Sequence, residues 1–376
     1  MAAINDPWHF PRPDLARRLL FGLTDGPARA LTMFAPRRTG KTEFLLKDFA
    51  PLASRERHRV VYVSFWEAPA APLALLLHAL ETSLKGGRLT DRLRSGAAAL
   101  APKLALSAPL PGTAASVEID LGALDVEPPA ELLLYLGDLL ERVSDAGHPT
   151  MLLLDEVQEL ARDERHRPLV AALRTALDVR SDRLRAIFTG SSQTGLRSMF
   201  SHREAPFFHF GTPLDLPALG RPFVDHLVAV HGRITDEALD ADAAFAMFER
   251  LHSNPYFFRL AMETLVLDPA VGPDEAEVRV RDRAADELGY DHSWLALEPL
   301  QRAVLAELAL GTERPFAADT RASIGARLGD GEAPSSARVQ GALKRLERRR
   351  LIDRLDGTWR VADPGLAEWV REFGDL

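Results

Sequence analysis

A run of eight residues joins an apolar segment to a helical one and has the composition of a phosphate-binding loop. Residues 30–34 are apolar and long enough for a buried strand, and residues 43–49 have the spacing of a helix that Pro51 is expected to end. The loop between them consists of Ala35, Pro36, Arg37, Arg38, Thr39, Gly40, Lys41 and Thr42. Backbone N–H groups in such a loop, together with the positive end of the following helix, attract a phosphate before any side chain acts. We therefore predict a nucleotide-phosphate cradle, the alternative being a chance Gly-Lys-Thr on a surface turn.

Individual residues of this loop suit phosphate chemistry. Lys41 can add a point charge toward the β- and γ-phosphates of a nucleotide, and the Thr42 hydroxyl is placed to ligate Mg²⁺. Gly40 lets the backbone pass close to the phosphates. The usual pattern begins with glycine, and Ala35 stands there instead, which makes the motif less specific.

Two adjacent carboxylates follow a second buried strand. Residues 151–154 are apolar, and Asp155 and Glu156 come where that strand would emerge at the carboxyl edge of a parallel sheet. Asp155 is predicted to hold Mg²⁺ through water, and Glu156 to orient and polarise an attacking water. In the alternative, Asp155 caps the next helix over 157–162 and Glu156 is solvated. The phosphate cradle earlier in the chain favours the catalytic interpretation.

A third strand, over residues 184–189, ends in small polar residues. Ser191 and Ser192 could sense the γ-phosphate or position the water by hydrogen bonding. They could equally form a turn and a helix cap, which is the commoner use of serine. The sequence leaves both interpretations open.

The composition is that of a globular protein without thiol chemistry. The 376 residues suit two or three domains, and 46% of them are hydrophobic, which is enough for ordinary cores. The absence of cysteine excludes disulfides, thiol catalysis and thiolate metal sites. Since the formal net charge is −8, any contact with nucleic acid must come from a local basic patch. The start of the chain lacks the order of a signal peptide and no apolar run approaches about 18 residues, so we expect a cytoplasmic protein that does not enter a membrane.

Strand-like and helix-like segments alternate along the first half of the chain. A strand over 59–65 and a helix over 71–84 follow the cradle helix, which predicts an α/β fold with a parallel P-loop sheet sandwiched by helices. Residues 86–130 interrupt this pattern, and we expect an insertion that carries a hairpin there. A helix over 130–143 then resumes the alternation.

The last part of the chain has the pattern of a winged helix-turn-helix. Three short helices and a hairpin are expected over 299–361. The third helix, over 336–350, has an inner face formed by Val339, Leu343 and Leu346. Its candidate DNA contacts are Arg338, Lys344, Arg345, Arg348 and Arg349. Such a helix could enter a major groove of DNA. Winged helices also serve packing and protein contact, and basic residues near a helix C-terminus stabilise the helix by interacting with its dipole, so both alternatives stay open.

Taken in order, these features resemble the archaeal-type ATPases, a branch of the AAA-like P-loop proteins related to the signal-transducing STAND group. The matching segments are 34–42, 152–158, 188–192, 205–208 and 253–257. The resemblance covers about residues 1–270, and a terminal winged helix is in keeping with it. It implies an ASCE-type sheet, with the Asp-Glu strand between the cradle strand and its neighbours, followed by a helical lid.

The resemblance also implies roles for particular residues. Ser191 or Ser192 takes the family's sensor position, and Ser192 is our catalytic candidate. Asn254 and Pro255 match a lid motif that approaches the nucleotide, with Ser253 replacing its glycine.

The chain departs from the family at the position of an arginine that acts from a neighbouring subunit. Family members often carry an arginine shortly after the segment matched by 205–208, whereas this chain has His209 and Phe210 there. Arg203 is the nearest substitute, and the alternative is a solvated surface arginine.

We therefore expect a P-loop ATPase core over 1–217, a helical lid over 218–290 and a winged helix-turn-helix domain over 291–376. The expected function is Mg²⁺-dependent ATP binding and hydrolysis that moves the lid and the tail, in a regulatory or DNA-associated protein. One alternative is a slow nucleotide-gated switch that docks a protein partner through its tail, and another is a DNA-binding regulator whose nucleotide only stabilises the fold. Besides ATP, the candidate partners are duplex DNA, another protein and a second copy of the chain.

Overall fold

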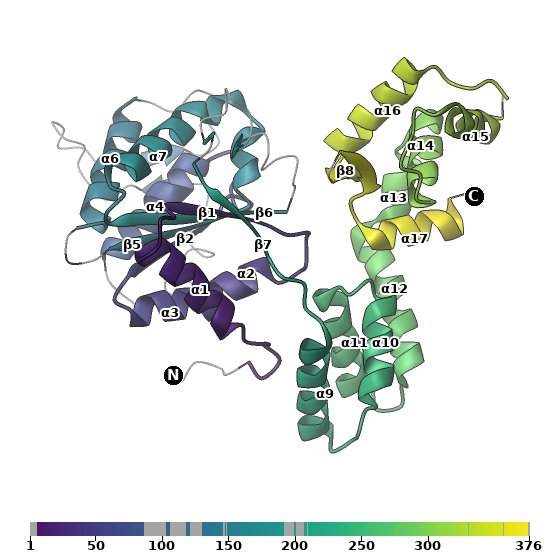
Figure 1. Cartoon of the computed structure of the whole chain (residues 1–376), viewed down its shortest axis with the longest axis horizontal. Coiled ribbons are helices and arrows are strands. Elements are labelled where there is room, and N and C mark those ends of the chain that lie inside the picture. The colour runs from purple at the N-terminus through teal and green to yellow at the C-terminus, as the bar shows by residue number, and fades with distance from the viewer. Residues whose placement is uncertain are drawn as a thin grey trace. The chain divides into compact units, whose positions relative to one another are not determined.

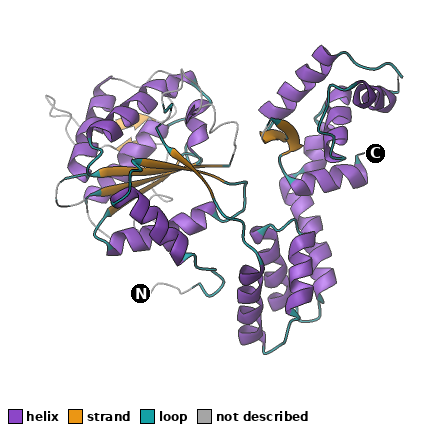
Figure 2. Ribbon diagram, viewed as in Figure 1, coloured by secondary structure: helices purple, strands orange, loops and turns teal. Residues whose placement is uncertain are grey.

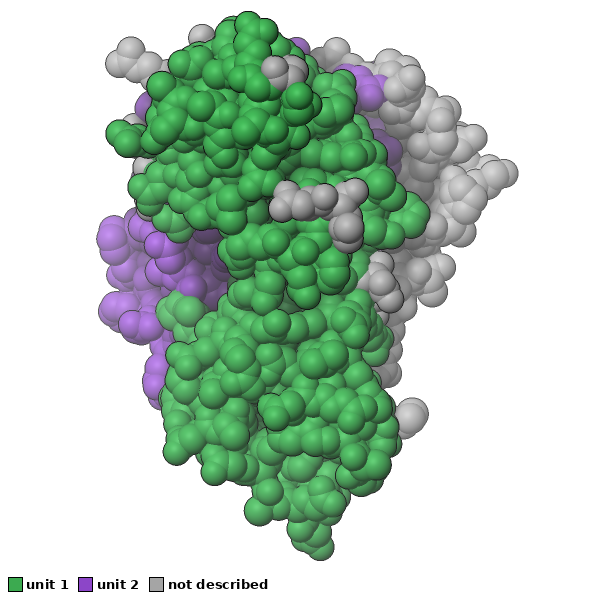
Figure 3. All heavy atoms as spheres, turned by 90° about the vertical axis from the view of Figure 1, so that its right-hand side faces the viewer, with its two compact units in different colours: residues 1–10, 38–40, 217–376 green, residues 11–37, 41–216 purple. Residues whose placement is uncertain are grey.

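The computed structural model describes most of the chain and divides it into two compact units. The described residues are 6–85, 103–105, 118–120, 130–145, 147, 149–191, 199–200, 207–208, 210–329, 331–355 and 357–374. The sheet unit consists of residues 11–37 and 41–216, and the helical unit consists of residues 1–10, 38–40 and 217–376 (Figure 3). The segments predicted to form the lid and the winged helix both belong to the helical unit, and the boundaries of the three expected domains stay a prediction.

Five parallel strands form the centre of the sheet unit. They are β1 (Ala30–Phe34), β2 (Arg59–Ser64), β5 (Thr150–Asp155), β6 (Leu184–Gly190) and β7 (Thr212–Asp215), and they pair in the order β2-β5-β6-β1-β7. Figure 1 labels these strands, and Figure 2 draws strands in orange. The predicted α/β P-loop sheet is confirmed. One detail is corrected: the Asp-Glu strand β5 does not pair with the cradle strand β1, because β6 lies between them. Alternation of strands and helices predicts that strands are parallel but does not fix their order.

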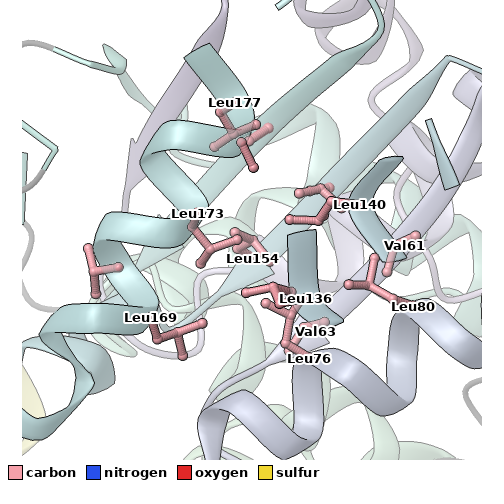
Figure 4. Packing of buried hydrophobic residues seen from close by; sticks show 14 of the residues in the cluster. Val61, Val63, Leu76, Leu80, Leu136, Leu140, Leu154, Leu169, Leu173 and Leu177 are labelled. Carbon is pink, nitrogen blue, oxygen red and sulfur yellow. The ribbon is translucent and has the colours of Figure 1, made fainter. Parts of the chain in front are cut away.

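Helices cover both faces of this sheet. On one face lie α4 (Pro72–Leu84), α6 (Ala130–Val143) and α7 (Arg167–Val179), whose leucines pack against alternate residues of the strands (Figure 4). On the other lie α1 (Pro13–Thr24) and the helix that follows the cradle. Side chains alternate between the two faces of a strand. In β5, Leu152 and Leu154 therefore pack under α4, α6 and α7, whereas Met151 and Leu153 pack on the face covered by α1 and the cradle helix. Asp155 follows Met151 and Leu153 in this alternation, so its side chain lies on the face that the cradle helix covers.

The helix after the cradle is longer than predicted. It runs as α2 (Lys41–Glu43), the π-helix η1 (Phe44–Phe49) and α3 (Ala50–Arg55), so Pro51 does not end it. Proline has no N–H to donate and normally breaks a helix. The change from π to α geometry places Pro51 in the first turn of α3, where proline is tolerated.

The helical unit has two apolar cores. The first is formed by α9 (Arg221–Thr235), α10 (Ala241–Arg250), α11 (Pro255–Leu267) and α12 (Pro273–Leu288), with Trp8 and Phe10 packed against it. The second is formed by α13 (Tyr290–Leu295), α14 (Pro299–Ala309), α15 (Ala318–Leu328), α16 (Ser336–Arg348), the hairpin β8 (Ile352–Leu355) and β9 (Thr358–Val361), and α17 (Pro364–Phe373). The three helices and the hairpin predicted for the tail are therefore present.

Two further expectations can be compared with the described residues. Within the insertion, β3 (Lys103–Ala105) and β4 (Glu118–Asp120) form an antiparallel pair, as the predicted hairpin requires, and the rest of that segment lies outside the described residues. In the described part of the chain, every helix is too short or too polar to cross a membrane.

Candidate active site

The cradle adopts the backbone conformation of an anion-binding loop. Arg38 and Gly40 both have positive φ, 64° and 85°, which turns successive N–H groups toward one side of the loop. Glycine suits the second of these positions because it has no Cβ to clash. Ala35 is buried and has no positive φ, so the alanine that replaces the usual glycine causes no backbone strain.

Lys41 is drawn into the loop and buried. Its ammonium donates hydrogen bonds to the carbonyl oxygens of Ala35 at 2.7 Å and Pro36 at 2.9 Å, and only 5% of the residue is exposed. Burial lowers the pKa of the ammonium, and the carboxylates of Glu156, 4.0 Å away, and Asp155 counteract part of that shift. The lysine thus holds a poorly solvated charge at the position where a phosphate would be bound.

Asp155 accepts hydrogen bonds on both carboxylate oxygens. Its Oδ2 accepts from the hydroxyls of Thr42 at 2.7 Å and Tyr62 at 3.1 Å. Its Oδ1 accepts from the Thr189 hydroxyl and from the backbone N–H of Glu156 at 3.1 Å. Burial and the neighbouring carboxylate raise the pKa of Tyr62, so the phenol stays a donor. The network joins the cradle helix to three adjacent strands, β2, β5 and β6.

Glu156 has a strained backbone and a side chain held on one oxygen. Its φ and ψ are 54° and 41°, in the left-handed region that non-glycine residues seldom adopt. Its Oε2 accepts from the Ser191 hydroxyl at 2.7 Å and from the Gln158 amide. Its Oε1 is the oxygen 4.0 Å from the Lys41 ammonium. Residues that keep strained conformations are common in functional sites, where the surrounding structure enforces them.

The alternative interpretation of this acidic pair, in which Asp155 caps the next helix, does not describe the structure. A short 3₁₀ helix, η3 (Val157–Ala161), follows, its N-cap residue is Glu156, and that cap makes no side-chain hydrogen bond. Asp155 is buried and Glu156 is mostly buried, with 16% of its side chain exposed.

The structure brings together Lys41, Thr42, Asp155, Glu156 and Ser191, all of which the sequence singled out. Ser192 and Arg203, our candidates for a sensor and a trans-acting arginine, lie outside the described residues, as does His209.

The two arginines of the cradle have aromatic partners. The Arg37 guanidinium lies 4.6 Å from the ring centre of Trp66. Arg38, which belongs to the helical unit, lies over Tyr256, 4.9 Å from its ring centre. Pro255 is the first residue of α11, and the Asn254 side chain caps that helix by accepting from the N–H of Tyr256. The lid motif therefore has a local capping role, and its approach to a nucleotide stays a prediction.

The sequence analysis missed Tyr62, Gln158 and Thr189. The signal that could have found Tyr62 is the strand register: Tyr62 pairs with Leu153, so Tyr62 and Asp155 face the same side of the sheet. Thr189 follows the pair formed by Phe188 and Leu154, which places it beside Asp155. Both inferences require the order β2-β5-β6, which the sequence does not give.

The basic helix of the tail presents most of its predicted DNA contacts to solvent. Arg338, Lys344, Arg348 and Arg349 are exposed, whereas Val339, Leu343 and Leu346 are buried in the tail core. Arg345 is half-buried and its guanidinium lies 3.5 Å from the Glu298 carboxylate. Four of the five candidate contacts are thus accessible, three on α16 and Arg349 at its C-cap.

Comparison with known proteins agrees with this architecture. No protein-family model and no curated protein matches the sequence. The Walker-type ATPase PABY2304 of Pyrococcus abyssi matches with a TM-score of 0.64 at 18% identity, over 97% of this chain and 100% of its own. The ORC2 protein of Aeropyrum pernix, solved as ADPNP-ADP complexes, matches with a TM-score of 0.57 at 17% identity, over 96% of this chain and 91% of its own. The chain therefore has an α/β P-loop NTPase fold, which it shares over nearly its whole length with these two proteins.

Proposed function

We propose that the protein is a Mg²⁺-dependent ATPase whose cycle moves its lid and its winged-helix tail. The observation that carries the proposal is the 2.7 Å hydrogen bond between Thr42 and Asp155, residues 113 positions apart in the sequence. It joins the phosphate cradle to the acidic pair, the two parts that a phosphoryl-transfer site requires. The nucleotide complexes of the Aeropyrum pernix ORC2 protein support the assignment of a nucleotide to this fold.

The cradle residues fit a magnesium nucleotide. The Lys41 ammonium is buried and donates to two neutral carbonyl oxygens, with the nearest carboxylate, that of Glu156, 4.0 Å away, and a polyphosphate would add negative charge closer to it. Thr42 and Asp155 offer hard oxygen donors of the kind Mg²⁺ prefers. When bound, Mg²⁺ would neutralise charge that develops on the transferring phosphate. Lys41, Thr42 and Asp155 would thus hold the nucleotide and its metal.

Glu156 would act as the base that orients water. Ser191 and Gln158 hold one of its oxygens, Oε2, and leave Oε1 on the side of Lys41 and the cradle. A carboxylate fixed in this way can accept a proton at one defined atom. Ser191 therefore acts on the base in this proposal, and the predicted contact of Ser191 or Ser192 with the γ-phosphate is a separate expectation.

Within the helical unit, charged contacts tie the lid helices to the tail. Glu368 of α17 accepts from Arg281 of α12 at 2.9 Å, and its other oxygen lies 2.9 Å from Nε2 of His252, next to the lid motif. Such partly exposed contacts contribute about 0–1 kcal/mol each but fix an orientation. A movement of the lid would accordingly be transmitted to α17.

The direct test is ATP turnover by the purified chain, with Mg²⁺ or with EDTA, and with or without duplex DNA at low salt. Turnover that requires Mg²⁺ is the expected result, and stimulation by DNA would identify a nucleic-acid-coupled ATPase. Tight nucleotide binding without turnover in any condition would instead support the slow switch that docks a protein partner. Absence of nucleotide binding would contradict the proposal altogether.

For the tail, we expect that removing the charges of Arg348 and Arg349 together weakens duplex binding. Log affinity falls with log salt concentration, and each phosphate contact contributes about −0.9 to that slope. The double alanine variant should therefore make the slope shallower by about 2. Fluorescence anisotropy with a labelled duplex across a salt series measures it. The matched control replaces Arg17 and Arg18, two exposed arginines of α1, by alanine. An equal loss in both variants would mean that overall charge, not α16, determines binding.

A further inference from the structure

We propose that Tyr62 is a positioning residue for the metal site: its hydroxyl fixes the Oδ2 side of Asp155 so that the carboxylate is oriented before Mg²⁺ arrives. The inference rests on the proposed function and adds a residue of β2 that neither the cradle nor the acidic pair contains.

The hydrogen bonds of Asp155 leave its carboxylate little freedom to rotate. An ionised carboxylate can accept about four hydrogen bonds, two on each oxygen. The Thr189 hydroxyl and the Glu156 N–H donate to Oδ1, and the Thr42 and Tyr62 hydroxyls donate to Oδ2. Both oxygens are therefore held, and by groups that come from different elements of the sheet unit.

The two donors on Oδ2 differ in how firmly they are placed. Thr42 belongs to the cradle, and its hydroxyl oxygen is the predicted metal ligand, so its orientation will depend on the metal and the nucleotide. Tyr62 lies in the middle of β2, paired with Leu153, and its ring packs against the core beneath the cradle helix. Tyr62 is thus the donor to Oδ2 whose position is set by strand pairing and core packing and not by a metal or nucleotide.

Such an arrangement has a defined consequence for metal affinity. Groups that orient the ligands of a metal typically change affinity or activity by about 10- to 100-fold when they are removed. Without the Tyr62 hydroxyl, the remaining donor to Oδ2 among the described residues would be Thr42, the residue that the metal itself would engage. Oδ1 would keep the Thr189 and Glu156 donors, but the Oδ2 side would have to be fixed at the moment of binding, which weakens Mg²⁺ and leaves the phosphate contacts of the cradle intact.

The test compares nucleotide affinity with and without Mg²⁺ in wild type, Tyr62→Phe and Tyr135→Phe. Tyr62→Phe keeps the ring and removes only the hydroxyl. Tyr135→Phe is the matched control, because that buried hydroxyl donates to Glu81 between α6 and α4. Calorimetric titration of a non-hydrolysable ATP analogue, in Mg²⁺ or in EDTA, gives the factor by which Mg²⁺ tightens binding. We expect Tyr62→Phe to reduce that factor by about 10-fold or more while the affinity in EDTA is unchanged, and Tyr135→Phe to change neither.

The outcomes separate this inference from the proposed function. If wild type binds the nucleotide no better with Mg²⁺ than without, the proposed function fails and the role of Tyr62 fails with it. If wild type shows the Mg²⁺ effect and Tyr62→Phe retains all of it, only the role of Tyr62 is overturned. Tighter Mg²⁺ binding in Tyr62→Phe would also overturn it, since the hydroxyl would then compete with the metal. A loss of affinity in EDTA as large as that in Mg²⁺ would show a general structural role instead.

Discussion

Lys41→Ala is expected to lower ATP affinity by two to three orders of magnitude or more. The Lys41 ammonium is buried in the cradle, where its present partners are the carbonyl oxygens of Ala35 and Pro36. Removing one partner of a buried charge pair costs about 3–5 kcal/mol, and about 1.4 kcal/mol corresponds to a tenfold change in affinity. Calorimetric titration with ATP and Mg²⁺ measures the loss directly.

The same helix supplies the control for this variant. Lys47→Ala removes a partly exposed lysine whose ammonium pairs with Glu43, one turn away, and it should leave ATP affinity unchanged. Thermal unfolding without nucleotide checks that Lys41→Ala is folded, and Lys47→Ala should unfold like wild type because its ion pair is partly exposed. If Lys41→Ala bound ATP as tightly as Lys47→Ala does, the loop would not be a phosphate cradle.

The main residues of the candidate site could be singled out from the sequence because they lie in two short segments, and their chemical roles stay predictions. The Gly40-Lys41-Thr42 run and the Asp155-Glu156 pair each follow an apolar strand, and parallel strands place their carboxyl ends at one edge. Thr42 and Asp155 could therefore be expected to meet without knowledge of which strands are neighbours. In the structure the Thr42 hydroxyl donates to Asp155 Oδ2 at 2.7 Å, and the roles assigned to the two residues stay predictions.

The supporting residues could not be predicted, because their roles depend on strand order. Tyr62 and Thr189 contact Asp155 only because β2 and β6 lie on either side of β5. Had β5 paired directly with β1, other residues would border Asp155. The wrong prediction at Pro51 has a similar origin. Propensity treats proline as a helix breaker, whereas the π turn before it changes which N–H groups are needed.

The second large effect is expected for Glu156→Gln, which should bind ATP and fail to hydrolyse it. An amide has nearly the shape of the carboxylate, and its oxygen can still accept from Ser191 and Gln158, so the strained turn at residue 156 and the cradle should persist. An amide cannot take a proton from water, however, and loss of a general base typically lowers turnover by about 100- to 10,000-fold. Single-turnover measurements beside nucleotide titration separate the two effects.

The comparison of the two site variants decides whether binding and chemistry reside in different side chains. Glu164→Gln, the same change at an exposed position just beyond η3, should turn over like wild type. Lys41→Ala should lose ATP binding. Glu156→Gln should keep an ATP affinity close to that of wild type, because the Glu156 carboxylate lies 4.0 Å from the Lys41 ammonium, which has two closer partners. If Glu156→Gln lost ATP binding as completely as Lys41→Ala, its carboxylate would serve mainly to hold the lysine. If both variants turned over at the wild-type rate, hydrolysis would take place elsewhere and the edge of the sheet at β1, β5 and β6 would not be the active site.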